Sequence, residues 1–205
     1  MSSEQLRRSW VANAGAWTEA VREQRIESRR LVTDAAIVNA VLATQPRTLL
    51  DLGCGEGWLA RALSSHGIAV TGVDASAPLI ESARALGGAD FLVASYDELP
   101  AGPFDTIVAN FSLLEEHLPQ LPAHRHFVIQ TLHPAFVGGP YQDGWRTETL
   151  DGWREPMPWF FRTLESWSRA LGSYAKVEIL EPMHPEKGVP ASIIFRSAAA
   201  EPPLW

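Results

Sequence analysis

Residues 49–63 read LLDLGCGEGWLARAL: an apolar run, three glycines at alternate positions, and then the beginning of a helical pattern. Gly53, Gly55 and Gly57 allow backbone torsions and close approaches that a Cβ would forbid. A helix that follows such a turn directs its free N–H groups and its positive dipole end toward it. The stretch therefore predicts a strand, a ligand-binding turn and a helix in succession, with the turn at the carboxyl end of a sheet. The alternative is a glycine-rich turn that holds no ligand.

Apolar segments alternate with helical segments on both sides of this stretch. Such alternation predicts a parallel sheet with helices on both of its faces. Helices are expected at 4–22, 33–43, 58–65 and 77–86, and strands at 47–52, 68–73, 91–94, 104–109 and 127–132. Thr33 is the expected N-cap of the second helix. Two further strands, 176–181 and 191–196, share a short connection and should pair antiparallel. We therefore expect a doubly wound α/β fold, a three-layer sandwich around a mostly parallel seven-stranded sheet with an antiparallel last strand.

The composition narrows the class of protein. The chain has 205 residues, of which 46% are hydrophobic, and a formal net charge of −7. This composition excludes a disordered chain, and the negative charge argues against general binding of nucleic acid, which needs clustered positive charge. Cys54 is the single cysteine, so an intrachain disulfide is excluded. No apolar run is long enough for a membrane span, and the first residues do not form a signal peptide, so we expect a cytoplasmic protein.

Two carboxylates flank the glycine turn and indicate the kind of ligand. Asp74 ends the next strand, 21 residues after Gly53, and an acid at that distance hydrogen-bonds ribose hydroxyls. Asp51 precedes the first glycine by two residues, where it would repel a pyrophosphate and attract an ammonium group. Trp58 takes the sixth position, at which a dinucleotide site needs a small residue. These residues favour a cofactor with a ribose and a cationic amino-acid end, although a nicotinamide cofactor remains an alternative.

The string LDLGCGEG, with GVDAS about 20 residues further on, resembles the class I S-adenosylmethionine-dependent methyltransferases. The resemblance implies that S-adenosyl-L-methionine is the cofactor and that Ser95 takes the position of the family's usual adenine-contacting acid, with Tyr96 or Asp97 as substitutes. It implies a cofactor site made of Asp51, Gly53, Cys54, Gly55, Asp74, Ala75, Ser95, Tyr96, Asn110 and Phe111, with no metal. A buried packing role is the preferred interpretation of the Cys54 thiol. The segment 112–126 departs from the family because it contains two prolines, and only a short helix is expected there.

The segment 133–162 is rich in glycine, proline and large aromatic residues, which is typical of a functional loop. We interpret it as a packed lid whose Tyr141, Trp145 and Trp159 bind the methyl acceptor; a surface patch or a dimer contact is the alternative. His133 lies at the end of the fifth strand and is the expected general base, with a structural histidine as the equal alternative.

The sequence thus predicts one methyltransferase domain over 1–205. It would consist of N-terminal helices (1–46), a cofactor-binding half (47–133), an aromatic lid (134–170) and C-terminal strands (171–205). The expected function is methyl transfer to an oxygen or nitrogen atom of a small molecule, by a monomer or homodimer that binds neither nucleic acid nor membrane. A nicotinamide-dependent oxidoreductase and a non-catalytic S-adenosylmethionine-binding protein remain as alternatives.

Overall fold

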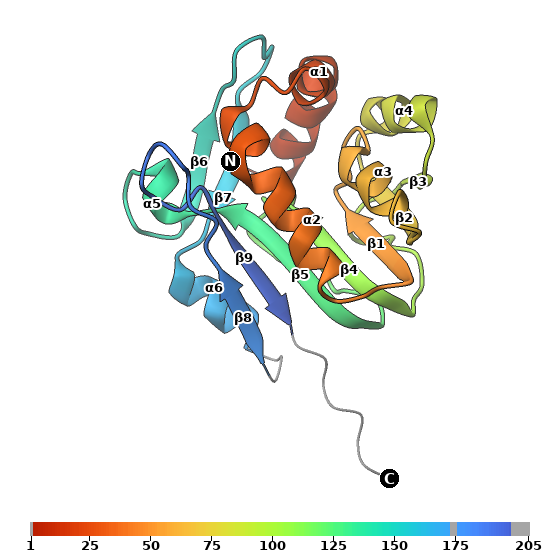
Figure 1. The fold of residues 1–205 in the computed structure, drawn as a ribbon. Coiled ribbons are helices and arrows are strands. Elements are labelled where there is room, and N and C mark those ends of the chain that lie inside the picture. Colours follow the sequence, from red (N-terminus) through yellow and green to blue (C-terminus); the bar gives the residue numbers. More distant parts are fainter. Residues whose placement is uncertain (1, 173–175, 198–205) are drawn as a thin grey trace.

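A central sheet organises the structure, a computed structural model that describes residues 2–172 and 176–197 (Figure 1). The strand order is β3-β2-β1-β4-β5-β9-β8. Its strands are β1 (Thr48–Leu52), β2 (Ala69–Asp74), β3 (Asp90–Val93), β4 (Phe104–Asn110), β5 (His124–Leu132), β8 (Val177–Leu180) and β9 (Ser192–Ser197). All pairings from β3 to β5 are parallel, and β9 runs antiparallel to both β5 and β8. The predicted fold class is therefore confirmed. Residues 198–205 of the expected C-terminal segment lie outside the described residues.

The predicted helices begin and end close to the expected residues: α1 (Ser3–Arg22), α2 (Asp34–Leu42), α3 (Trp58–Ser64) and α4 (Ala77–Leu86). Helices α5 (Pro134–Val137) and α6 (Leu164–Ala170) were not predicted. Ser2 and Gln5 form a capping box that fixes the first residue of α1. Thr33 does not cap α2, contrary to expectation. It ends a π-helical turn (Arg29–Thr33) that runs directly into α2, so its backbone is already helical and its side chain makes no capping bond.

The two faces of the sheet form two apolar cores, because successive strand residues point to opposite faces. Leu49 of β1 packs with α2, α3 and α4 on one face, together with Val108 and Val128. Leu50, the next residue, packs on the other face with Phe127 and Phe195. Trp167 of α6 lies 5.5 Å from Phe195, between ring centroids, and closes this second core.

The crossover from β4 to β5 differs from the prediction, because residues 111–123 contain no helix. Pro119 and Pro122 each remove a backbone N–H donor, and each disfavours the helical conformation of the residue before it. The segment instead covers the second core with the partly buried side chains of Leu118 and Leu121 and the buried Leu113. An irregular crossover thus takes the place of a helix over this part of the sheet.

The segment 133–162 is also more regular than the predicted lid. It contains α5 and a separate antiparallel pair, β6 (Gly144–Glu148) and β7 (Met157–Phe161). Helix α1 lies across the top of the molecule in Figure 1 and contacts both β7 and α4. The buried amide of Asn13 joins α1 to the residues before β7: it donates to the carbonyl of Glu155 (2.7 Å) and accepts from the N–H groups of Arg154 and Glu155. The β6–β7 pair therefore supports α1.

Candidate functional site

A cavity of about 340 Å³ lies at the carboxyl ends of the parallel strands. The glycine turn forms its floor, Asp74 and Ala75 follow β2, residues 94–97 follow β3, and residues 110–112 end β4. Strands that run parallel bring such connections to one edge of the sheet. The cavity brings together these predicted residues: Gly53, Gly55, Asp74, Ala75, Ser95, Tyr96, Asn110 and Phe111.

The backbone around the cavity floor adopts unusual torsions at three residues. Gly53 and Gly55 have φ values of +66° and +57°, a left-handed conformation that disfavours other residues. Phe111, at the end of β4, also has a positive φ, of 54°. A non-glycine residue held in this region stores strain that the surrounding structure must offset, and such strain concentrates at functional sites.

Asp74 connects the second strand to the glycine turn. One of its carboxylate oxygens accepts the N–H of Gly55 (3.0 Å), and the other accepts the N–H of Ser76 (2.8 Å). Burial raises the pKa of this carboxyl, and the two backbone hydrogen bonds oppose the rise. Because a carboxylate offers about four lone-pair sites, Asp74 keeps acceptor capacity toward the cavity that it lines.

Two acceptor atoms near this edge are buried without a partner among the described residues. They are Oδ2 of Asp51, in β1, and Oδ1 of Asn110, in the neighbouring strand β4. Asp51 is 1% exposed, and burial, followed by the charge of Asp74, raises its pKa to about 7. Buried polar atoms without partners are rare and call for a ligand or water. Asp51 itself does not line the cavity wall.

Cys54 lies behind the turn and does not line the cavity. Its N–H donates to the carbonyl of Val73 (2.9 Å), and its thiol packs against Gly72, where an added Cβ would stand 2.9 Å from Sγ. Burial strongly raises the pKa of the thiol, which keeps it protonated. This geometry matches the packing interpretation.

The roof of the cavity comes from α1. Leu6, Arg7, Trp10 and Trp17 line the cavity from this helix. The Trp10 and Trp17 rings meet edge to face with centroids 5.3 Å apart. Their spacing of seven residues places both on one helix face, which was the available signal. The roof continues over the crossover segment, where Glu115 pairs with Arg7 (3.5 Å) and His117 also lines the cavity.

The predicted base His133 lies outside the cavity lining. It is the N-cap of α5: its Nδ1 accepts the N–H of Ala135 (3.1 Å), and its Nε2 lies 3.2 Å from the carboxylate of Glu181. The side chain is largely buried, and both ring nitrogens have partners. This geometry corresponds to the structural alternative for His133.

The three predicted acceptor-binding residues also lie outside the cavity lining. Tyr141 is half exposed and donates its hydroxyl to Glu165 (2.7 Å), and Trp145 packs edge to face on Phe160. Trp159 is buried in an apolar cluster with Leu6 of α1. The aromatic residues of this segment therefore lie behind the cavity: Trp159 packs under α1, and the N–H of Phe160 donates to the carbonyl of Leu114 in the crossover segment (2.8 Å).

Two kinds of site are absent from the part of the chain that the structure describes. Residues 2–172 and 176–197 contain no group of three or more His, Cys, Asp or Glu side chains arranged to hold a metal ion. Within the same residues, none of the helices has the length and apolar character that crossing a membrane requires.

Comparison with known proteins agrees with this geometry. Residues 49–134 match the family model described as a methyltransferase domain. An uncharacterized methyltransferase of Schizosaccharomyces pombe is 39% identical over 101 residues, which cover 46% of this chain and 37% of that relative. The chain thus spans well under half of the length of this relative.

Two solved structures share the fold. The S-adenosylmethionine-dependent methyltransferase of Mesorhizobium loti aligns with a TM-score of 0.59 and 24% identity, over 78% of this chain and 95% of its own. The complex of DhpI with SAM and HEP aligns with a TM-score of 0.62 and 16% identity, over 97% and 100% of the two chains. At these identities the likeness concerns the fold, whereas the family match covers the glycine turn and the strands around it. Residues 49–134 of this chain are thus similar to a methyltransferase domain, and the chain shares the fold of solved S-adenosylmethionine-dependent methyltransferases.

Proposed function

We propose that this protein transfers a methyl group from S-adenosylmethionine to an oxygen or nitrogen atom of a small molecule. The observation that carries the proposal is the convergence of the glycine turn and Asp74 on one cavity that α1 closes from above. The family match over residues 49–134 supports the same reaction.

The residues present fit the cofactor. Asn110 lines the cavity, and its unpartnered, buried oxygen suits a ligand that donates hydrogen bonds, as an ammonium group does. Asp51 lies behind the lining, and its unpartnered oxygen would act on the same group through its charge or through a bridging water. Asp74 has lone pairs left for ribose hydroxyls beyond those used by Gly55 and Ser76. Ala75 and residues 95–96 line the same cavity and are assigned to the nucleoside end. When bound, the cofactor supplies a methyl group that its positively charged sulfur already activates for displacement.

The task that remains for the chain is to align an acceptor and exclude water, which together can lower a barrier by several kcal/mol. The indoles of Trp10 and Trp17 supply an apolar roof, and the ion pair of Arg7 with Glu115 supplies a polar edge. The apolar roof suits a small molecule better than a nucleic-acid backbone, whose binding needs clustered positive charge. The formal net charge of −7 also disfavours nucleic acid.

Proton removal, where the acceptor requires it, is assigned to His117. His117 lines the cavity, whereas His133 lies outside its lining with both ring nitrogens in use. Histidine is the side chain that most often serves as a general base in enzymes. The assignment concerns a hydroxyl or protonated amine acceptor.

The test is an assay of S-adenosylhomocysteine release by the full chain with S-adenosylmethionine and a panel of small hydroxyl- and amine-bearing molecules. We expect release that depends on one class of acceptor and is lost in Asp74→Ala. Binding of the cofactor without release on any acceptor would favour the non-catalytic alternative. A thermal shift with NAD(H) and none with S-adenosylmethionine would favour the oxidoreductase.

A further inference from the structure

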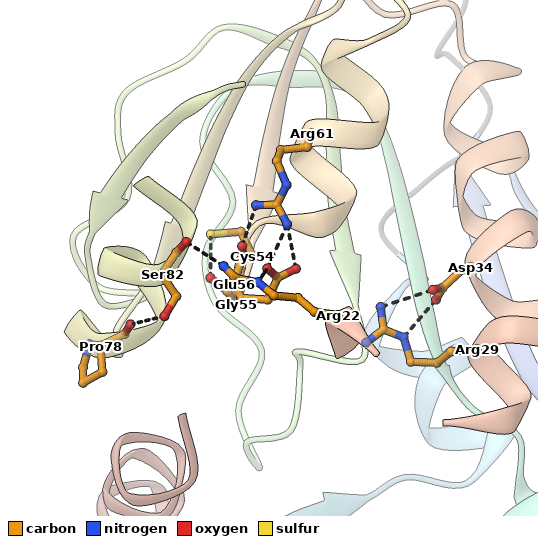
Figure 2. A network of polar contacts seen from close by, with 9 residues as sticks. All are labelled: Arg22, Arg29, Asp34, Cys54, Gly55, Glu56, Arg61, Pro78 and Ser82. Atoms are coloured by element: carbon orange, nitrogen blue, oxygen red, sulfur yellow. Dashed lines mark hydrogen bonds and ion pairs between the residues drawn. The ribbon is translucent and has the colours of Figure 1, made fainter. Parts of the chain in front are cut away.

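A buried carboxylate lies inside the glycine turn, next to the cavity floor (Figure 2). Glu56 follows Gly55, and its side chain is fully buried. Arg61 of α3 holds both carboxylate oxygens, at 2.9 and 2.8 Å, and also donates to the carbonyl of Glu56 (2.7 Å). Arg22 approaches from the other side and donates from Nε to the Glu56 carboxylate at 3.0 Å. A carboxylate so buried is tolerated only when it is paired and hydrogen-bonded.

The two arginines have different positions in the chain. Arg61 lies five residues after Glu56 and closes a local contact around the start of α3. Arg22 lies in the last turn of α1, and its pairing with Glu56 joins segments 34 residues apart. Its second guanidinium nitrogen donates to the carbonyl of Ser82 in α4 (2.9 Å). Arg22 therefore attaches the roof helix both to the glycine turn and to α4.

This attachment is adjacent to the point where the roof meets the floor. Trp17 precedes Arg22 by five residues, and its indole nitrogen lies 3.5 Å from the position of a Cβ on Gly55. Trp17 and Gly55 both line the cavity. Helix α1 positions Trp17, and the turn that contains Glu56 positions Gly55. The distance between the two residues therefore depends on how α1 is held against the turn.

We propose that Arg22 is a positioning residue for the cofactor: through Glu56 it holds α1 against the glycine turn and so fixes the height of the cavity between Trp17 and Gly55. This inference rests on the proposed function, because it concerns the same site. Without Arg22 the turn keeps Arg61, so the floor persists, while the C-terminal end of α1 loses this attachment to the turn and to α4. The apparent cofactor affinity is then the intrinsic affinity multiplied by the fraction of molecules in which α1 remains closed.

The test compares three variants of the full chain by calorimetric titration with S-adenosylhomocysteine. Arg22→Gln removes the charge, and Arg22→Lys restores it without the second hydrogen bond. Arg25→Gln is the matched control, because Arg25 lies just beyond the same helix end and pairs with the exposed Glu19 and Glu23. Hydrogen–deuterium exchange of residues 3–22 in each unliganded protein reports how firmly α1 is attached.

We expect Arg22→Gln to weaken S-adenosylhomocysteine binding about tenfold, Arg22→Lys to weaken it about threefold, and Arg25→Gln to stay within about twofold of the parent. Hydrogen–deuterium exchange should rise in α1 of Arg22→Gln but not in β4 or β5.

Unchanged affinity in a folded Arg22→Gln, or equal losses of affinity in Arg22→Gln and Arg25→Gln, would overturn the proposal. If Arg22→Gln does not fold, the Lys variant decides: the proposal requires affinity intermediate between the parent and Asp74→Ala, and parental affinity overturns it. Absence of binding by the parent chain would instead overturn the proposed function.

Discussion

The Cβ of Ser112 lies 2.4 Å from the point where a Cβ on Gly53 would stand. Ser112 follows β4 and donates its hydroxyl to the carbonyl of Leu52 in β1 (2.5 Å), while Tyr96 donates to the carbonyl of Ser112 (3.0 Å). The connections after β1, β3 and β4 therefore pack directly on one another beneath the cavity. Glycine at position 53 is required by this contact as well as by its positive φ.

Gly53→Ala and Gly55→Ala should differ in their effects, although both residues have a positive φ. An alanine at position 53 must displace Ser112, whereas an alanine at position 55 meets Trp17 at an ordinary contact distance of 3.5 Å. We expect Gly55→Ala to lower the free energy of unfolding by about 1 kcal/mol, the strain of the backbone alone. Gly53→Ala should lower the free energy of unfolding by roughly 2 kcal/mol more than Gly55→Ala does. Urea unfolding measures both, and equal losses would contradict the packing at Ser112.

Asp51→Asn should raise stability and lower cofactor affinity at the same time. Burial raises the pKa of Asp51 to about 7, above its value in the unfolded chain. The native state therefore binds an additional proton between about pH 4 and pH 7, and the free energy of unfolding falls as pH rises through that window. The substitution removes this pH-dependent loss of stability. The free energy of unfolding of the variant should therefore exceed that of the parent by about 1 kcal/mol or more at pH 8, and the two should differ little below pH 4.

The cofactor affinity of Asp51→Asn should fall although its stability rises, because the ammonium group of the cofactor interacts favourably with the ionised carboxylate that the substitution removes. We expect S-adenosylhomocysteine to bind roughly tenfold more weakly to Asp51→Asn at pH 8. Parallel losses of stability and affinity would show instead that Asp51 is a structural group whose replacement damages the turn.

Asp74→Ala should weaken cofactor binding by more than about tenfold, since it removes a charged acceptor from the cavity. It also leaves the N–H groups of Gly55 and Ser76 without their acceptor, so some stability is lost as well. Asp74→Asn separates the two effects, because an amide oxygen can still accept from one of these groups. Calorimetry and thermal unfolding of both variants give the comparison; parental affinity in a folded Asp74→Ala removes Asp74 from the site.

Much of the fold follows from local sequence, and so does the floor of the cavity. The apolar strands and the glycines between 49 and 63 predicted the parallel sheet because burial on both faces leaves a continuous apolar signal. The support of the roof did not follow, because it depends on contacts between distant segments. Asn13 binds the backbone of residues 154 and 155, more than 140 positions away. The tryptophans after 144 therefore resembled a lid in sequence, whereas in the structure they support α1.

Replacement of two histidines tests the assignment of the base. His133→Ala should reduce stability by about 1 kcal/mol, since it removes the N-cap of α5, and should leave the affinity for S-adenosylhomocysteine unchanged. His117→Ala should leave stability unchanged, because the side chain is exposed, and should lower turnover on the acceptor found in the release assay. Thermal unfolding and a pH profile of turnover measure the two effects. A greater loss of turnover in His133→Ala than in His117→Ala would restore His133 as the base.

The most direct test of the central claim, that the glycine turn and its carboxylates bind a sulfonium nucleoside, is calorimetric titration of the full chain with S-adenosylmethionine and S-adenosylhomocysteine. We expect saturable binding of both at one site per chain, abolished or strongly weakened in Asp74→Ala, and no binding of NAD(H). An absence of heat with both nucleosides, from protein that thermal unfolding shows to be folded, would contradict it.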